Sequence, residues 1–143
     1  MTQRLKLNEL SVGMSLPGLT KQVTQEQINL YADASGDFNP IHINVDFARQ
    51  TPLGGTVAHG MLILSYISEF MTDNFGGNWL TSGKLRMRFK TPARPGDTIT
   101  VGGKISKVQE EDDYISICCD ILCHNQADET VIIGETNVQV KEL

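Results

Sequence analysis

The sequence predicts one α+β domain, in which a long apolar helix packs against a curved antiparallel sheet. The most apolar run, from Met61 to Met71, has little polar surface on any side, as expected for a helix enclosed by other structure. After Trp79 the pattern changes to alternating apolar and polar residues, which is typical of strands. At 143 residues the chain can bury a single core, so we expect residues 1–143 to form one domain.

The first part of the chain is expected to form a short strand and a short helix. Alternating residues 19–23 predict the strand. Thr24 and Gln27 form a capping-box pattern at the start of a helical periodicity that Gly36 ends. We therefore expect a helix over about residues 25–35.

The second part is expected to form an antiparallel meander. Turn residues separate its apolar segments, which favours short connections between neighbouring strands. The long helix should end before this region, near residues 76–77, where two glycines follow each other. The expected strands lie at about 84–90, 99–108, 114–122 and 131–140.

The residues that can carry chemistry cluster in one stretch, from YADASGDFNPIH to AHGML. In it, Asp37 and His42 flank Asn39 and Pro40. No helix can run through this pair, because proline lacks an N–H group and pushes the preceding residue to extended angles. The side chains of Asp37 and His42 are therefore expected on one turn.

The segment after Pro40 has a period of two. Apolar residues at 41, 43 and 45 alternate with His42 and Asn44. This pattern predicts an extended segment with the apolar side chains on one face and His42 on the other. We expect His42 to lie outside the core and to point back toward Asp37. Residues 46–50 are expected to form a further helical turn.

A glycine opens the long apolar helix. His59 and Gly60 precede the apolar run. A helix start has unpaired amide N–H groups and the positive end of the helix dipole, and glycine lets a ligand approach the backbone. Such an end can stabilise a developing oxyanion. A carboxylate, an imidazole and this helix start together suit the addition of water to a conjugated thioester, or its removal.

Composition argues against several classes of function. The 12 Lys+Arg and 17 Asp+Glu give a formal net charge of -5, which argues against general binding of nucleic acid or anionic membranes. No signal peptide opens the chain and no apolar run approaches the roughly 20 residues of a membrane span, so we expect a cytoplasmic protein without membrane insertion. Cys118, Cys119 and Cys123 lack paired-ligand spacing, so we expect reduced thiols, no disulfide framework and no metal site.

The segments YADASGDFNPIH and GGTVAHGML, followed by RFKTPARPGDT, resemble the MaoC-like dehydratases, and in particular the stand-alone (R)-specific enoyl-CoA hydratases. The resemblance covers nearly the whole chain. It implies a hot-dog fold, paired into a homodimer or a higher oligomer, with active sites near the subunit interface. It also implies reversible hydration of trans-2-enoyl thioesters to (3R)-3-hydroxyacyl thioesters. No cofactor is implied beyond the coenzyme A or phosphopantetheine of the substrate.

The same resemblance assigns roles to residues. It implies that Asp37 and His42 activate one water and that the backbone amide of Gly60 polarises the thioester carbonyl. Our hypothesis is that Asp37 deprotonates the water while His42 orients it and relays a proton. Asn39 would support the pair, and both Asn39 and His59 are candidates for substrate contact. For His59, packing at the helix start is the alternative role.

A basic run alternates with apolar residues in the strand expected at 84–90. Arg86, Arg88 and Lys90 are candidates for binding the phosphates of coenzyme A or the phosphopantetheine of an acyl-carrier protein. The alternative is a solvated face of a half-buried strand. Two other functions remain open: a hot-dog acyl-CoA thioesterase, which would release a free thiol, and a non-catalytic subunit of a heteromeric dehydratase.

Overall fold

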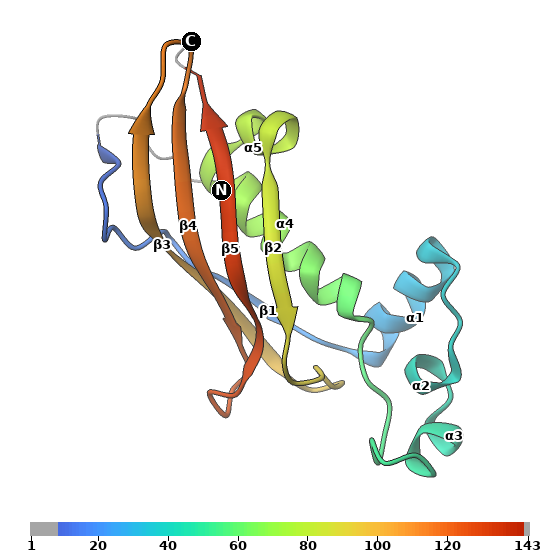
Figure 1. Cartoon of the computed structure of the whole chain (residues 1–143). Coiled ribbons are helices and arrows are strands. Elements are labelled where there is room, and N and C mark those ends of the chain that lie inside the picture. Colours follow the sequence, from blue (N-terminus) through green and yellow to red (C-terminus); the bar gives the residue numbers. More distant parts are fainter. Residues whose placement is uncertain (1–8, 142–143) are drawn as a thin grey trace.

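The computed structural model describes residues 9–141 of the chain. In them, a five-stranded antiparallel sheet curves around helix α4, and helices α1 to α3 gather beyond the first turn of α4 (Figure 1). The elements are β1 (Leu19–Gln22), α1 (Gln25–Ser35), α2 (Pro40–Ile43), α3 (Val45–Arg49), α4 (Gly60–Phe75), α5 (Gly77–Ser82), β2 (Lys84–Phe89), β3 (Thr98–Glu110), β4 (Ile115–His124) and β5 (Thr130–Val140).

The strand order is β1-β3-β4-β5-β2. Strands β3, β4 and β5 follow one another as predicted, and all four strand pairings are antiparallel. The expected meander is nevertheless incomplete, because β2 pairs with β5 instead of β3. The connection from β2 to β3 therefore crosses the sheet, and β2 forms an edge beside the start of α4 (Figure 1).

Helix α4 buries its apolar side chains against the inner face of the sheet. Ile67, Phe70 and Met71 are fully buried, and they follow the spacing of three and four residues that one helix face requires. Helix α4 approaches the sheet closely at Gly103. A Cβ atom at this position would lie 3.1 Å from the ring of Phe70. This packing fixes the first turn of α4, and therefore Gly60, against the sheet.

The caps of α1 lie at the predicted residues, but within residues 9–141 only the Thr24 half of the predicted capping box is present, because the side-chain oxygen of Gln27 accepts a hydrogen bond from the Tyr66 hydroxyl. The hydroxyl of Thr24 accepts a hydrogen bond from the backbone N–H of Gln27 at 3.1 Å, and Gly36 ends the helix with φ at 77°. Helix α1 thus delivers Asp37 at a defined point of the chain. The expected turn at 46–50 is helix α3, and α4 ends before Gly76.

Helix α5 was not predicted. Trp79, which was assigned to the start of the strand region, lies within α5, and its indole N–H donates to the Ser68 hydroxyl of α4 at 3.1 Å. The strands begin only at Lys84. Within residues 9–141, no helix has both the length and the apolar character needed to cross a membrane.

Candidate active site

The segment after Asp37 forms helix α2, and the predicted extended segment is wrong. The Asn39 side chain caps this helix by accepting from the Ile41 N–H at 3.2 Å. Pro40 occupies the first helical position, where its missing N–H has no cost and its fixed φ suits the helix. Capping therefore outweighs the alternation. As a consequence His42 is 8% exposed and Ile43 is 37% exposed, so the prediction that His42 lies outside the core is wrong.

The ring of His42 is held in one tautomer. Its Nδ1 lies 2.7 Å from the backbone carbonyl oxygen of Val57. Because a carbonyl only accepts, Nδ1 must carry the hydrogen, and in the neutral ring Nε2 then has a free lone pair. The Gln25 side-chain amide also donates to the His42 carbonyl at 2.8 Å. The residue is fixed through both its ring and its backbone.

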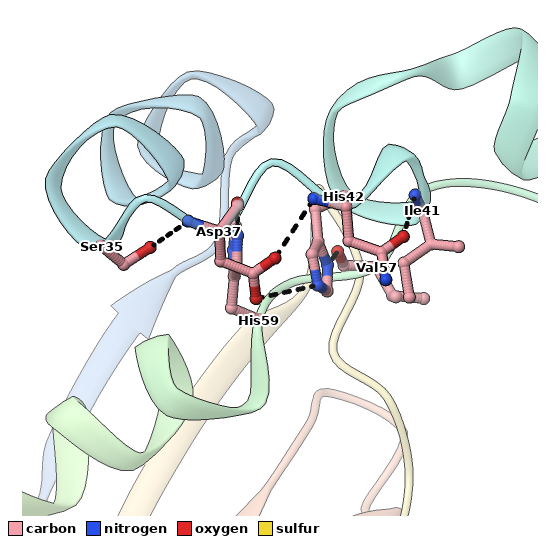
Figure 2. A network of polar contacts seen from close by, with 7 residues as sticks. Ser35, Asp37, Ile41, His42, Val57 and His59 are labelled. Carbon is pink, nitrogen blue, oxygen red and sulfur yellow. Dashed lines mark hydrogen bonds and ion pairs between the residues drawn. The ribbon is translucent and has the colours of Figure 1, made fainter.

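Asp37 directs its carboxylate toward His42, as predicted (Figure 2). Its backbone N–H donates to the Ser35 hydroxyl at 3.2 Å, and its Oδ1 accepts from the Asn39 N–H at 3.1 Å. The side chain is about half exposed to solvent. Asp37 therefore presents Oδ2 to His42 from a carboxylate whose other oxygen is held by the turn. Asn39 supports the pair from the turn through its backbone and its cap.

The two facing atoms are suited to hold one water. His42 Nε2 and Asp37 Oδ2 are 4.0 Å apart, which is too far for a direct hydrogen bond. A water at about 2.8 Å from each atom would have an angle of about 90° between them. Since both atoms are acceptors, such a water donates both hydrogens and keeps an oxygen lone pair free to attack an electrophile.

The backbone amide of Gly60 is available for a ligand. Gly60 is the first residue of α4, and within residues 9–141 its N–H has no protein acceptor. The residue is exposed and borders a cavity of about 270 Å³. That cavity is lined by Ala58, Gly60, Ile63, Phe89, Lys90, Thr91, Pro92, Ala93 and Val131. The amide can therefore meet the carbonyl oxygen of a bound ligand.

His59 lies behind the pair, in contact with both of its members. Its Nε2 is 2.9 Å from the Asp37 carbonyl oxygen, and its ring stacks on His42 with centroids 3.8 Å apart. Only 3% of His59 is exposed, and it does not line the cavity beside Gly60. This placement groups His59 with the internal support of the site.

The basic residues of β2 and the lysine that follows this strand lie on different sides of the sheet. Arg86 and Arg88 pair with Glu135 and Ile133 of β5, and paired residues share one face of a sheet. This is the outer face, because the neighbouring Phe89 pairs with the fully buried Ile132 on the helix side. Both arginines are therefore separated from the Gly60 cavity. Lys90, which follows β2, lines that cavity.

Within residues 9–141, one group of potential metal ligands consists of Asp37, His42 and His59. Their ligand atoms lie within 4.8 Å of one another. The two imidazole rings, however, are stacked with an angle of only 24° between their planes. Lone pairs in nearly parallel ring planes run side by side and do not converge on one ion. The arrangement suits a bridging water better than a chelated metal.

The cysteines lie in β4, away from these residues. Burial raises the pKa of Cys119 to about 11 and the pKa of Cys123 to about 12. Both thiols therefore stay protonated at neutral pH and are poor nucleophiles. The expectation of free thiols buried in the core is confirmed for these two, whereas Cys118 is half-buried.

Sequence reasoning missed two supports of the site. The Gln25 side chain bridges the His42 carbonyl and the Thr56 hydroxyl, which donates to Gln25 Oε1 at 2.8 Å. The Val57 carbonyl selects the tautomer of His42. A backbone carbonyl has no sequence signal, and Gln25 is at an ordinary first-turn position of a helix. Neither was detectable without the packing of α1 against the loop before α4.

An antiparallel sheet wrapped around one long helix is the hot-dog fold, as the sequence predicted. A profile for the MaoC like domain matches residues 10–117, and the chain belongs to this family. An (R)-specific enoyl-CoA hydratase of Rhodospirillum rubrum is 32% identical over 85% of this chain and 83% of that protein. A 3-hydroxybutyryl-CoA dehydratase of Methylorubrum extorquens is 29% identical over 95% of this chain and 84% of that protein. The structure of an R-hydratase from Pseudomonas aeruginosa superposes with a TM-score of 0.81 at 25% identity, covering 95% and 85% of the two chains.

Proposed function

We propose that the protein is a hydro-lyase that reversibly adds water to trans-2-enoyl-CoA thioesters to form (3R)-3-hydroxyacyl-CoA thioesters. The 4.0 Å gap between two proton acceptors, Asp37 Oδ2 and His42 Nε2, is the observation that carries this proposal. The reaction class is supported by relatives that are named an enoyl-CoA hydratase and a hydroxyacyl-CoA dehydratase.

In the hydration direction, a water held by Asp37 and His42 attacks the β-carbon of the enoyl group. As the C–O bond forms, the water loses one proton to the carboxylate of Asp37, and His42 Nε2 orients the other hydrogen. Electrons of the C=C bond move onto the thioester oxygen, which gives an enolate. The proton then passes to the α-carbon, either directly or through His42. The enzyme returns to its starting state, and dehydration follows the same steps in reverse.

The Gly60 amide stabilises the enolate oxygen. It has no protein acceptor and borders the cavity, so it can donate to the thioester oxygen as negative charge develops. The positive end of the α4 dipole adds to this effect. No metal is needed in this scheme, because proton transfer is performed by the pair and charge stabilisation by the backbone.

The stereochemical course follows from the one-sided arrangement of the pair. Asp37 and His42 hold the same water, so the oxygen and the returning proton reach the same face of the double bond. We expect syn addition. The (3R) configuration is proposed because relatives at 32% and 25% identity are named for (R)-specificity.

We propose that Lys90 contributes to binding the phosphates or pantetheine of the thioester, because among the three basic candidates only Lys90 lines the cavity beside Gly60. Lys90→Ala should raise KM for an enoyl-CoA, whereas Arg88→Ala on the outer face serves as the matched control. Equal effects of both substitutions would contradict the assignment. Activity on crotonyl-CoA and on crotonyl-acyl-carrier protein, measured in parallel, distinguishes the two carriers.

We also propose that two copies pair along β2. Among residues 9–141, β2 pairs only with β5, so its outer edge has free backbone groups. Exposed apolar side chains lie on this strand and on the group α1 to α3 beyond it, among them Leu85, Phe89, Phe38 and Phe47. Sedimentation should give twice the chain mass of 15.8 kDa, and Leu85→Glu should give the monomer. A monomeric wild type would contradict the proposal.

One assay separates the lyase from the two alternatives. Purified protein is mixed with crotonyl-CoA, and the loss of enoyl-thioester absorbance is followed together with thiol release. Loss of absorbance without free thiol supports hydration. Free coenzyme A would identify a thioesterase. Inactivity of the single chain toward short, long and carrier-bound substrates would favour the non-catalytic subunit of a heteromeric dehydratase.

A further inference from the structure

We propose that His59 is the positioning residue that joins the water-activating pair to the Gly60 amide, and that it acts mainly through the hydrogen bond from its Nε2–H to the Asp37 carbonyl. This inference rests on the proposed function. His59 is bonded through the chain to Gly60, and its ring contacts both Asp37 and His42. It is therefore the shortest link between the two halves of the site.

The tautomer of His59 follows from its partner. The Asp37 carbonyl can only accept, so Nε2 at 2.9 Å must carry the hydrogen. The opposite nitrogen, Nδ1, is buried and has no partner within residues 9–141. The Nε2–H tautomer of His59 is thus the one that its contact with Asp37 supports.

The position of the hydrogen bond between His59 and Asp37 explains how it affects catalysis. Asp37 lies on a loop between α1 and α2, and its side chain is about half exposed. Local contacts from Ser35 and Asn39 shape the turn but belong to the same stretch of chain. The His59 bond connects that turn to the start of α4. Without it, the distance from Asp37 to the thioester bound at Gly60 is less well defined.

The ring of His59 also helps to position His42, on which it stacks. The ring centroids of His42 and His59 lie 3.8 Å apart with nearly parallel planes, and the ring of Tyr31 also packs against His59, with centroids 4.9 Å apart. This packing restricts rotation of the His42 ring, whose Nδ1 is already tied to Val57. The hydrogen bond acts on Asp37 and the stack acts on His42, so the two contributions can be separated by substitution.

Two variants of similar size separate them. His59→Gln places an amide N–H near the position of Nε2 and removes the ring, whereas His59→Phe keeps the ring and removes the donor. If the hydrogen bond positions Asp37, His59→Phe should lower kcat about 10- to 100-fold with little change in KM, because a misplacement of about 1 Å can cost this much. His59→Gln should recover at least about tenfold of that loss. Equal loss in both variants, or unchanged kcat in a folded His59→Phe protein, overturns the proposal.

A second measurement does not depend on activity. The chain has three histidines, so long-range ¹H–¹⁵N correlation spectra of the imidazoles are simple to assign with single variants. We expect the Nε2–H tautomer for His59 and the Nδ1–H tautomer for His42. An Nδ1–H tautomer for His59 overturns the inference. If the wild type is inactive, the proposed function fails, and the tautomer of His59 alone decides whether this residue holds Asp37.

Discussion

Removing the Gly60 amide hydrogen tests the proposed oxyanion donor directly. In Gly60→Pro the N–H is replaced by the proline ring at the first position of α4, where proline is favoured. The preceding residue, His59, has φ of -58° and ψ of 134°, which is the extended conformation that a following proline requires. The helix start can therefore keep its geometry while the proposed oxyanion donor is lost.

The expected effect is large because the donor acts only as charge develops. Loss of one oxyanion donor typically costs about 2.7–4 kcal/mol, or about 10²- to 10³-fold in kcat. Gly60→Ala is the matched control, because it keeps the N–H and adds the same Cβ atom. That atom lies 3.0 Å from the ring of Phe89, which is 54% exposed and can turn away. The ratio of the two variants thus measures the effect of replacing the amide hydrogen by the proline ring.

The assay is the initial rate of absorbance loss with crotonyl-CoA, together with thermal unfolding of both variants. Folding stability should be unchanged or slightly raised in Gly60→Pro, because proline restricts the unfolded chain. A folded Gly60→Pro protein whose kcat lies within a fewfold of Gly60→Ala would refute the oxyanion role of the amide.

Three further predictions concern the pair of Asp37 and His42, the cap of α2 and the buried thiols. Asp37→Ala and His42→Ala should each lower kcat by about 10²- to 10⁴-fold in steady-state assays, and near-normal turnover would remove that residue from the mechanism. Asn39→Ala removes the cap of α2 and should cost about 1 kcal/mol of folding stability, which lowers the thermal unfolding midpoint by about 2–4 °C. An unchanged midpoint in calorimetry would contradict a stabilising role of this cap. Burial raises the pKa of Cys119 to about 11 and the pKa of Cys123 to about 12. Both thiols should therefore resist a thiol-reactive dye at pH 8 until the protein unfolds. Rapid labelling of either cysteine in the native protein would contradict its burial.

The parts of the fold that depend on local chemistry were predictable from sequence. Thr24 and Gly36 bound α1 through their own backbone and side-chain preferences, whatever the rest of the chain does. Helix α4 was predictable because its apolar run is long. Helix α5 has only six residues, which is too short for a periodicity to be distinguished from the strands that follow.

Parts of the site depend on packing and strand register that local sequence patterns do not reveal. Alternation at residues 41–45 predicted an extended segment, but the cap from Asn39 and the preference of Pro40 for a helix start decided the structure. Burial of His42 followed, because α2 turns the ring toward Val57. The separation of Arg88 from the cavity depends on the pairing of β2 with β5, and this register connects residues far apart in the sequence.

We propose that Asp37 and His42 deliver one water from one side to an enoyl thioester whose oxygen is bound at Gly60. The measurement that tests it most directly is the configuration of the 3-hydroxybutyryl-CoA formed from crotonyl-CoA, determined by chiral analysis after thioester hydrolysis. We expect the (3R) product from the wild-type protein and no product from Asp37→Ala. A (3S) or racemic product, or free coenzyme A with the enoyl group intact, would contradict it.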